Sequence, residues 1–233
     1  DEYQKCLNFL RDYEDGGERP YMELLQEIAN RERSVIEIRL DDIVDFTNGN
    51  DMAFVNNIKK NTKRYIRHFQ KAIDDELLPD PTDGNFVDDV YDILRQQIDS
   101  RRLIQQQIAG ENGAPLPENE NAANSSVPPE LCRRYEISMI LESDEEPKKL
   151  REVRSQHVGN LVKVKGMVTR CTEVKPQLKV CVYTCDECGC TMFDAVQGES
   201  YMPIDVCQSD SCNQNRTTGK VHMQHRGSRF LKF

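Results

Sequence analysis

The sequence predicts an α+β protein of several domains, in which a helical bundle is followed by a small β-barrel that a cysteine-rich segment interrupts. Three observations predict this arrangement. Apolar residues recur at helical spacing through residues 1–109. They alternate with polar residues after a polar stretch at 110–130, and two pairs of cysteines lie within 183–220. The last residues, HRGSRFLKF, read as a strand that stops in mid-pattern, so the barrel is expected to be incomplete at the carboxy-terminus and the chain to be a piece of a longer protein.

Charge is distributed unevenly along the 233 residues. Residues 1–130 carry 15 Lys and Arg against 27 Asp and Glu, whereas residues 131–233 carry 16 against 13. An acidic front half repels a phosphate backbone, so any nucleic acid is expected to contact the back half. Charged residues make up 30% of the chain and no long apolar run occurs, which excludes a membrane span.

Nine cysteines without a secretory signal indicate a reducing compartment. The opening, DEYQKCLNFLRDYE, lacks the basic segment followed by an apolar one that a signal peptide needs. In such a compartment, clustered thiols bind metal more often than they form disulfides.

The first segments of the front half have helical and then extended patterns. Residues 3–13 place apolar side chains at helical spacing, and Gly16 and Gly17 end that helix. Pro20 then opens a second helix, since proline suits the first helical position. Residues 35–40 alternate between apolar and charged side chains, which predicts a short strand or an extended link.

Residues 51–78 carry the strongest helical pattern in the chain. Their apolar stripe consists of Val55, Ile58, Thr62, Tyr65, Ile66, Phe69 and Ile73. A further helix is predicted from about residue 86 to 109, after Pro and Gly residues that break the preceding one. Together these segments make residues 1–109 a helical subdomain. Nothing in it resembles a catalytic constellation, and His68 is expected to be structural.

Residues 110–130, GENGAPLPENENAANSSVPPE, separate the helical subdomain from the barrel. Gly, Pro, Asn, Ser and Glu with almost no large apolar residue cannot bury a core, so this stretch is predicted to be a flexible linker. Alternation with a period of two then assigns residues 131–182 to the first part of the barrel and 221–233 to its return strand. A small barrel with a long excursion between strands, and with Gly166 at a bend or bulge of the strand at 161–170, is typical of an OB-fold.

Four cysteines within residues 183–220 predict a metal site. Cys185 and Cys188 form a C-x₂-C knuckle, and Cys207 and Cys212 form a wider one after eighteen intervening residues. Two such pairs can converge as four thiolates on one tetrahedral zinc, because each loop presents both sulfurs to the same side. The extended segments between them, TMFDAVQ and SYMPIDV, are typical of a zinc ribbon. The zinc is expected to be structural, since four thiolates leave no position for water. Free cysteines and disulfides are the alternatives.

The other cysteines and the nearby histidines are not expected to bind the metal. Cys181 falls in an alternating strand, and Cys190 lies just outside the first knuckle. His222 and His225 follow the second knuckle at a spacing that could offer ligands, but the four-cysteine set is already complete. The remaining cysteines are expected to be ordinary small buried residues: Cys6, Cys132 and Cys171.

Three segments of the back half resemble the amino-terminal region of the minichromosome maintenance (MCM) proteins, the hexameric replicative helicases. They are PPELCRRYEI at 128–137, VRSQHVGNLVKVKGMVTRCTEVKP at 153–176, and the cysteine region from YTCDECG to GKVHMQHRGSRFLKF. The most specific element is VGNLVKVKGMVTR followed by VKP. The resemblance covers residues 128–233 well, whereas residues 1–109 match only loosely, as the variable helical subdomain of the family.

The resemblance implies a three-part amino-terminal domain and a set of partners. In the family, a helical subdomain, a zinc ribbon and an OB-fold form a tier of a ring through which single- and double-stranded DNA passes. The implied partners are other MCM paralogues in a hetero-hexamer, a second hexamer that meets the first through the zinc ribbons, and helicase loading and activation factors. The implied location is the nucleus.

The resemblance also implies where the enzyme activity lies. The full-length protein would be an ATP-dependent DNA helicase, with ATP and Mg²⁺ bound by a carboxy-terminal motor domain that this sequence lacks, so this fragment is expected to be inactive alone. The sequence is consistent with this, because it contains no G-x-x-x-x-G-K-[ST] motif for binding the phosphates of ATP. Gly219 and Lys220 are followed by Val221, and Gln214 stands where the first glycine of that loop belongs.

Basic residues of the predicted barrel are candidates for DNA contact. OB-folds bind single strands in a basic groove, and in the family such residues face the ring interior. By position in the motif VTRCTEVKP, the resemblance carries this role onto Arg170 and Lys175. Arg226, Arg229 and Lys232 in the return strand are further candidates. Because the chain has no Trp, contact is expected mainly with phosphates. The alternative is that these are solubilising charges at strand ends.

Two other classes of function explain part of the sequence. A free-standing zinc-ribbon and OB interaction module, as in transcription or ribosomal factors, explains the cysteines but not VGNLVKVKGMVTR or the large acidic front half. A small thiol redox protein that uses Cys185 and Cys188 requires a reactive thiolate beside a helix start, and the second cysteine pair argues against it.

Overall fold

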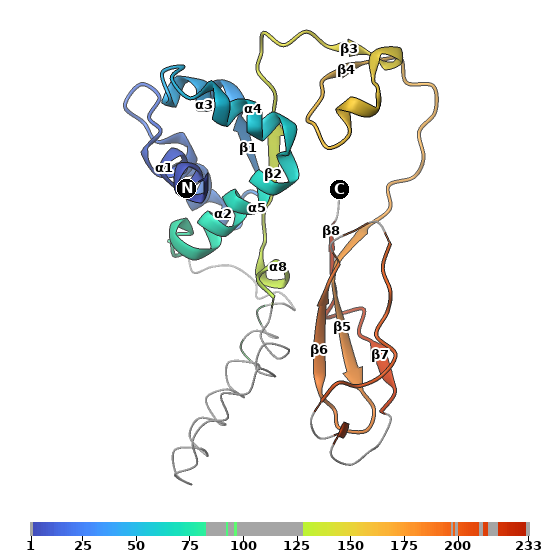
Figure 1. Cartoon of the computed structure of the whole chain (residues 1–233). Coiled ribbons are helices and arrows are strands. Elements are labelled where there is room, and N and C mark those ends of the chain that lie inside the picture. The colour runs from blue at the N-terminus through green and yellow to red at the C-terminus, as the bar shows by residue number, and fades with distance from the viewer. Residues whose placement is uncertain are drawn as a thin grey trace. The chain divides into compact units, whose positions relative to one another are not determined.

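The computed structural model describes residues 2–82, 92, 96, 128–196, 198, 200–209, 212–213 and 219–231. The chain forms two units, one of residues 1–86 and 134–171 and the other of residues 87–133 and 172–233 (Figure 1). The predicted helix at 86–109 lies outside the described residues except for positions 92 and 96, and so does most of the predicted linker.

The first unit begins with short helices whose apolar sides form one core. These are α1 (Glu2–Asp12), α2 (Pro20–Ala29), α3 (Leu40–Phe46), α4 (Met52–Lys60), α5 (Thr62–Ala72) and a π-helical turn (Ile73–Leu77). Phe9, Leu10 and Phe69 are almost completely buried in this core. The helices predicted at 3–13 and after Pro20 are confirmed, whereas α3 was not predicted.

The predicted helix at 51–78 is divided at Asn61. This residue has φ −141° and ψ 51°, which is outside the helical region, so it ends α4 and precedes α5. Nevertheless, the apolar stripe stays buried on both sides of the division, with Ile58 before it and Tyr65 after it. Periodicity alone therefore predicts a single helix.

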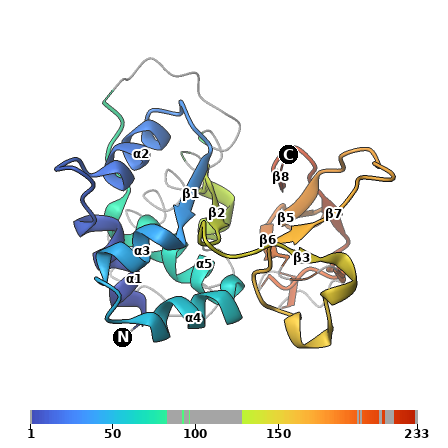
Figure 2. The same ribbon diagram turned by 90° about the horizontal axis from the view of Figure 1, so that it is seen from above.

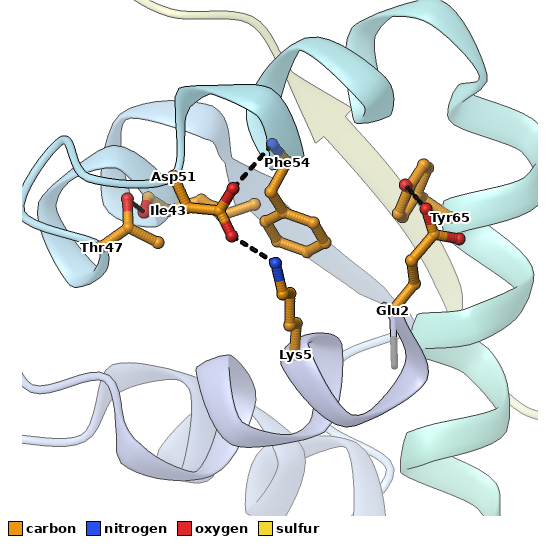
Figure 3. Close-up of polar contacts among 7 residues, drawn as sticks. All are labelled: Glu2, Lys5, Ile43, Thr47, Asp51, Phe54 and Tyr65. Atoms are coloured by element: carbon orange, nitrogen blue, oxygen red, sulfur yellow. Dashed lines mark hydrogen bonds and ion pairs between the residues drawn. The ribbon is translucent and has the colours of Figure 1, made fainter.

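Polar contacts fasten α1 to the helices that follow (Figure 3). The Asp51 carboxylate accepts the Phe54 backbone N–H at 3.2 Å, which caps α4, and also forms an ion pair with Lys5 of α1. In the same first turn of α1, Glu2 accepts a hydrogen bond from the Tyr65 hydroxyl at 2.6 Å. These bonds fix the first helix on the face that α4 and α5 present.

A two-stranded parallel sheet crosses the first unit. β1 (Val35–Arg39) confirms the predicted short strand, and Ile36 and Ile38 on one face are buried. Its partner is β2 (Glu136–Ile140), with Ile36 opposite Ile137. Sequence periodicity identifies both strands but not their pairing. The assignment of residues 131–182 to the first part of the OB-fold stays a prediction.

The remainder of the first unit is a small lobe. It contains β3 (Lys148–Lys149), two 3₁₀ turns (Leu150–Glu152 and Ser155–His157) and β4 (Val164–Lys165). β3 and β4 pair in parallel. The long strand predicted at 161–170 is thus only two residues long here, and no ladder hydrogen bonds extend it.

The second unit is a four-stranded antiparallel sheet built on β5 (Gln177–Cys185), and Figure 1 shows its elongated form. The partners of β5 are β6 (Thr191–Ala195), β7 (Val221–Met223) and β8 (Arg229–Leu231). A short helix, α8 (Pro129–Cys132), packs Leu131 against Val180 and Val182 of β5. The alternation predicted within residues 131–182 corresponds here to β5, whereas the return strand predicted at 221–233 is divided by a turn at residues 225–227 into β7 and β8.

Within the described ranges, no helix combines the length and the apolar character that a membrane crossing demands.

Candidate metal centre

The candidate metal centre lies at the end of the β5–β7 pair. Cys185 is the last residue of β5 and lies opposite Val221 of β7, so the chain leaves the sheet and returns to it side by side. A bridge between Val206 and Lys220 brings the second cysteine loop to the same place. The sheet thus carries both cysteine pairs to one point.

The four predicted sulfurs meet there. The ligand atoms of Cys185, Cys188, Cys207 and Cys212 all lie within 4.8 Å of one another. The Cys185 and Cys212 sulfurs are 3.9 Å apart, and the Cys188 and Cys207 sulfurs are 3.6 Å apart. Zinc holds thiolates at ~2.3 Å in a tetrahedron, which sets neighbouring sulfurs roughly 3.8 Å apart. All four cysteines are free thiols in the structure, and their spacing fits a zinc ion.

Backbone hydrogen bonds shape the two loops around the sulfurs. In the first loop, the Gly189 N–H donates to the Cys185 carbonyl at 3.1 Å, and Gly189 has a φ of 65°, which favours glycine. In the second loop, the Cys207 N–H donates to the Gly219 carbonyl at 3.1 Å. These bonds shape the two loops that carry the sulfurs.

Ser209 of the second loop contacts the sulfur cluster, and no local pattern in the sequence predicts this contact. Its hydroxyl lies 3.2 Å from the Cys188 sulfur and 3.1 Å from the Cys207 sulfur. This hydroxyl, followed by the Cys190 backbone, lowers the pKa of Cys188 to about 6. The same hydroxyl lowers the pKa of Cys212, but burial and the other cysteine sulfurs outweigh it and raise that pKa to about 11. The first thiol of the cluster therefore loses its proton readily, whereas the later thiols resist deprotonation. A bound cation would lower the cost of these later deprotonations.

Gly219 leaves space for the sulfurs. A Cβ atom at this position would lie 2.5 Å from the Cys185 sulfur and 3.2 Å from the Cys212 sulfur. The sequence does not predict this role of Gly219, because the contact joins residues that are far apart in the chain.

Replacing Gly219 with alanine should therefore weaken zinc binding by about 10- to 100-fold, since the new methyl group displaces two ligands. The measurement is a titration of the zinc-loaded chain with a competing chelator. Gly198→Ala is the matched control, because its added Cβ would meet nothing closer than 3.7 Å. Equal affinities of the two variants would contradict the steric argument.

The neighbouring candidates lie outside the sulfur cluster. Cys181 is buried in β5 and Cys190 is half-buried beyond the first knuckle. The His222 imidazole contacts the Asp186 carboxylate at 2.8 Å rather than a cysteine sulfur, and His225 is exposed. None of these four belongs to the group of ligand atoms found among the described residues.

The prediction that the remaining cysteines are buried is correct for one of three. Cys6 is buried, and burial raises its pKa to about 12. Cys132 is half-buried. Cys171 is exposed, so the prediction was wrong there, because residues 166–176 form no strand that could turn the side chain inward.

The predicted DNA-contact residues are spread over both units. Arg170 belongs to the first unit and Lys175 to the second, and both are exposed in the segment without regular structure. In the second unit Arg226 is exposed in the turn before β8, and Arg229 is half-buried at the start of that strand. Lys232 lies outside the described residues.

Comparisons with known proteins identify both parts of the chain. A family model described as the MCM N-terminal domain matches residues 4–123, and one described as the MCM OB domain matches residues 149–233. The first match includes the helical region, which the sequence resemblance covered only loosely.

Individual relatives agree with the family models. DNA replication licensing factor MCM7 of Arabidopsis thaliana is 37% identical over 97% of this chain and 30% of the relative. The mcm7-B protein of Xenopus laevis is 35% identical over 100% of the chain and 31% of the relative. The mcm7 protein of Schizosaccharomyces pombe is 34% identical over 94% of the chain and 28% of the relative. The chain therefore spans about 30% of the length of these relatives.

The fold also has a solved counterpart. The N-terminal domain of an archaeal MCM, solved at 1.8 Å, superposes with a TM-score of 0.59 and covers 98% of this chain and 71% of that one. At 16% sequence identity, this likeness concerns the fold alone. The sequence details CDECG, the C-x₄-C second knuckle, NQNRTTGK and GSRFLKF resemble the seventh paralogue most closely, in agreement with the relatives named MCM7. The chain belongs to the minichromosome maintenance (MCM) family, of which it comprises the N-terminal and OB domains.

Proposed function

We propose that this chain is the amino-terminal tier of one subunit of the hexameric MCM helicase. In this function it assembles with other MCM paralogues into a ring and guides single- and double-stranded DNA through the channel during replication initiation and fork unwinding. Loading and activation factors act on the assembly, in the nucleus. The observation that carries the proposal is the match of both domain models to one chain whose relatives are named DNA replication licensing factors.

We propose a structural zinc as the cofactor of this tier. Cys185, Cys188, Cys207 and Cys212 would hold it, and the ion would fix the shape of the loops at the tip of the second unit. Four thiolates close the coordination shell, so the ion would supply no reactive water. In the proposed ring, these tips of the ribbon contact a second hexamer head to head.

The proposal assigns helicase activity to the full-length protein rather than to this chain. ATP and Mg²⁺ would bind in a motor domain beyond the matched domains, since the sequence of 233 residues contains no phosphate-binding loop motif. Purified on its own, this chain should not hydrolyse ATP.

Native mass spectrometry of this chain mixed with the amino-terminal regions of the other MCM paralogues tests the proposal. Mixed oligomers with one zinc per chain are the expected result. A chain that carries zinc but remains monomeric in every mixture would contradict the ring and leave a zinc-ribbon and OB interaction module, the alternative function. A chain with reactive thiols and no zinc would contradict the metal assignment as well.

For DNA contact, we propose the residues matched by motif, Arg170 and Lys175, with Arg226, Arg229 and Lys232 as further contributors. Replacing Arg170 and Lys175 together with alanine should weaken binding of a single-stranded oligonucleotide. It should also lower the slope of log affinity against log salt by about 1.4, since each lost phosphate contact on a single strand accounts for about 0.7. Fluorescence anisotropy at several salt concentrations measures both. An unchanged slope would remove these two residues from the interface.

A further inference from the structure

The β3–β4 lobe lies in a basic stretch of the chain. Residues 148–170 contain seven Lys and Arg and one acid, Glu152, although the whole chain has a net charge of −9. Lys149 lies opposite Lys165 in the parallel register, so both side chains leave the same face of the ladder. The exposed cations of the stretch are Lys149, Arg151, Arg154, Lys163, Lys165 and Arg170. None of them forms an ion pair with a residue that the structure describes.

Two hydrogen-bond donors face each other inside this lobe. The Arg154 backbone N–H donates to Nδ1 of His157 at 3.0 Å, and this contact assigns the ring proton to Nε2. That Nε2 lies 3.2 Å from the Lys148 ammonium group, which can only donate. Both side chains are half-buried, and in the described part of the chain neither has a carboxylate partner. An anionic oxygen beside this pair would accept a hydrogen bond from each.

A helix that is distant in sequence borders the same lobe. The Leu161 N–H donates to the Lys59 carbonyl at 2.8 Å, and Figure 2 shows the end of α4 next to the lobe. The Lys59 ammonium group is already paired with Glu142 and Glu145, at 3.0 Å each. Lys60, the next residue, is exposed and adds its charge to the basic lobe.

We propose that Lys148 and His157 bind a phosphodiester oxygen of a nucleic-acid backbone, on a cationic surface that Lys60, Lys149 and Lys165 extend. Lys side chains are typical phosphate contacts, and an imidazole N–H can donate to the same oxygen. A chain of phosphates engages cations spread over a surface, whereas a free phosphate ion or a single phosphorylated side chain would engage only the central pair. This inference rests on the proposed function, which brings DNA to this tier, and it extends the DNA-binding surface of the first unit beyond Arg170.

The first test compares DNA binding by two matched variants of the whole chain. Lys148→Gln with His157→Asn should lower affinity for a labelled single-stranded oligonucleotide about three- to tenfold near 0.1 M salt and reduce the salt slope by about 0.7, because one cation is lost. Lys71→Gln removes the same charge from α5, where the ammonium group lies over the Tyr3 ring, and should change neither. Lys148→Arg should retain binding, which separates loss of charge from loss of fold.

Comparison with the Arg170 and Lys175 variant separates failure of the Lys148 and His157 site from failure of the proposed function. If that variant loses affinity while Lys148→Gln with His157→Asn keeps the parent slope, this inference is overturned and the proposed function stands. If the unmodified chain binds no DNA, both are overturned.

The second test observes the imidazole directly. A ¹H–¹⁵N correlation spectrum optimised for histidine should show His157 with its proton on Nε2. Its signals should shift when an oligonucleotide is added, while those of His68 on α5 should not. A proton on Nδ1 would overturn the assignment. So would inorganic phosphate that reproduces the full response of the oligonucleotide at the same phosphate concentration, because the site would then bind an ion rather than a nucleic-acid backbone.

Discussion

Replacing Cys207 with serine should abolish tight zinc binding and unfold the tip of the second unit. Structural zinc in small domains contributes an apparent ~10–16 kcal/mol at neutral pH, and a hydroxyl is a far weaker ligand than a thiolate. The Cys207 backbone N–H donates to the Gly219 carbonyl, and the Cys207 sulfur contacts the Ser209 hydroxyl. The substitution therefore changes a residue whose backbone and side chain are both fixed by hydrogen bonds. Native mass spectrometry should show no zinc on the variant.

Cys190→Ser is the matched control for this experiment. Cys190 lies two residues beyond Cys188 but outside the cluster of ligand atoms in the described residues. The control should therefore retain one zinc and the parent affinity. Loss of zinc from Cys190→Ser with retention by Cys207→Ser would show that the wrong four sulfurs had been assigned.

Replacing Leu10 with alanine should destabilise the first unit by about 2–5 kcal/mol. Leu10 is 1% exposed and lies in the core that α1 shares with the other helices, so its removal leaves a cavity. Because the chain has no Trp, unfolding in urea is best followed by circular dichroism of the helices. With a typical slope of about 1–3 kcal/mol per M, the midpoint should fall by roughly 1 M or more.

Leu78→Ala provides the comparison, because Leu78 is 47% exposed after the π-helical turn. The same side-chain atoms are removed there from a site that is already in contact with water, so the midpoint should change little. Equal midpoints for the two variants would mean that α1 does not pack in the core as described.

Local patterns in the sequence predict local features of this fold. The helical spacing that predicts α1, the proline that opens α2 and the alternation that predicts β1 all act within a few residues. The metal ligands could be predicted for a similar reason, since each loop of the Cys185 and Cys207 pairs must present two sulfurs to one side.

Features that depend on distant contacts could not be predicted in this way. The break at Asn61 leaves the apolar stripe buried, so periodicity does not reveal it. The parallel pairing of β1 with β2 joins segments about one hundred residues apart, and alternation says nothing about partners. At the metal centre, Gly219 and Ser209 act through space on sulfurs from other loops. Arg170 and Lys175 remain a motif-based prediction.

The pairing of β1 with β2 joins two parts of the first unit that are far apart in the sequence. Because strands at 35–39 and 136–140 are neighbours in one sheet, residues 40–135 form a closed loop whose ends are held by the fold. The first unit is therefore made from two stretches of the chain, residues 1–86 and 134–171. If the chain were cut between these stretches, the two parts would still be joined by the sheet and by the Tyr135 hydroxyl, which donates to Asp74 at 2.6 Å. The first unit could thus be assembled from two separate polypeptides.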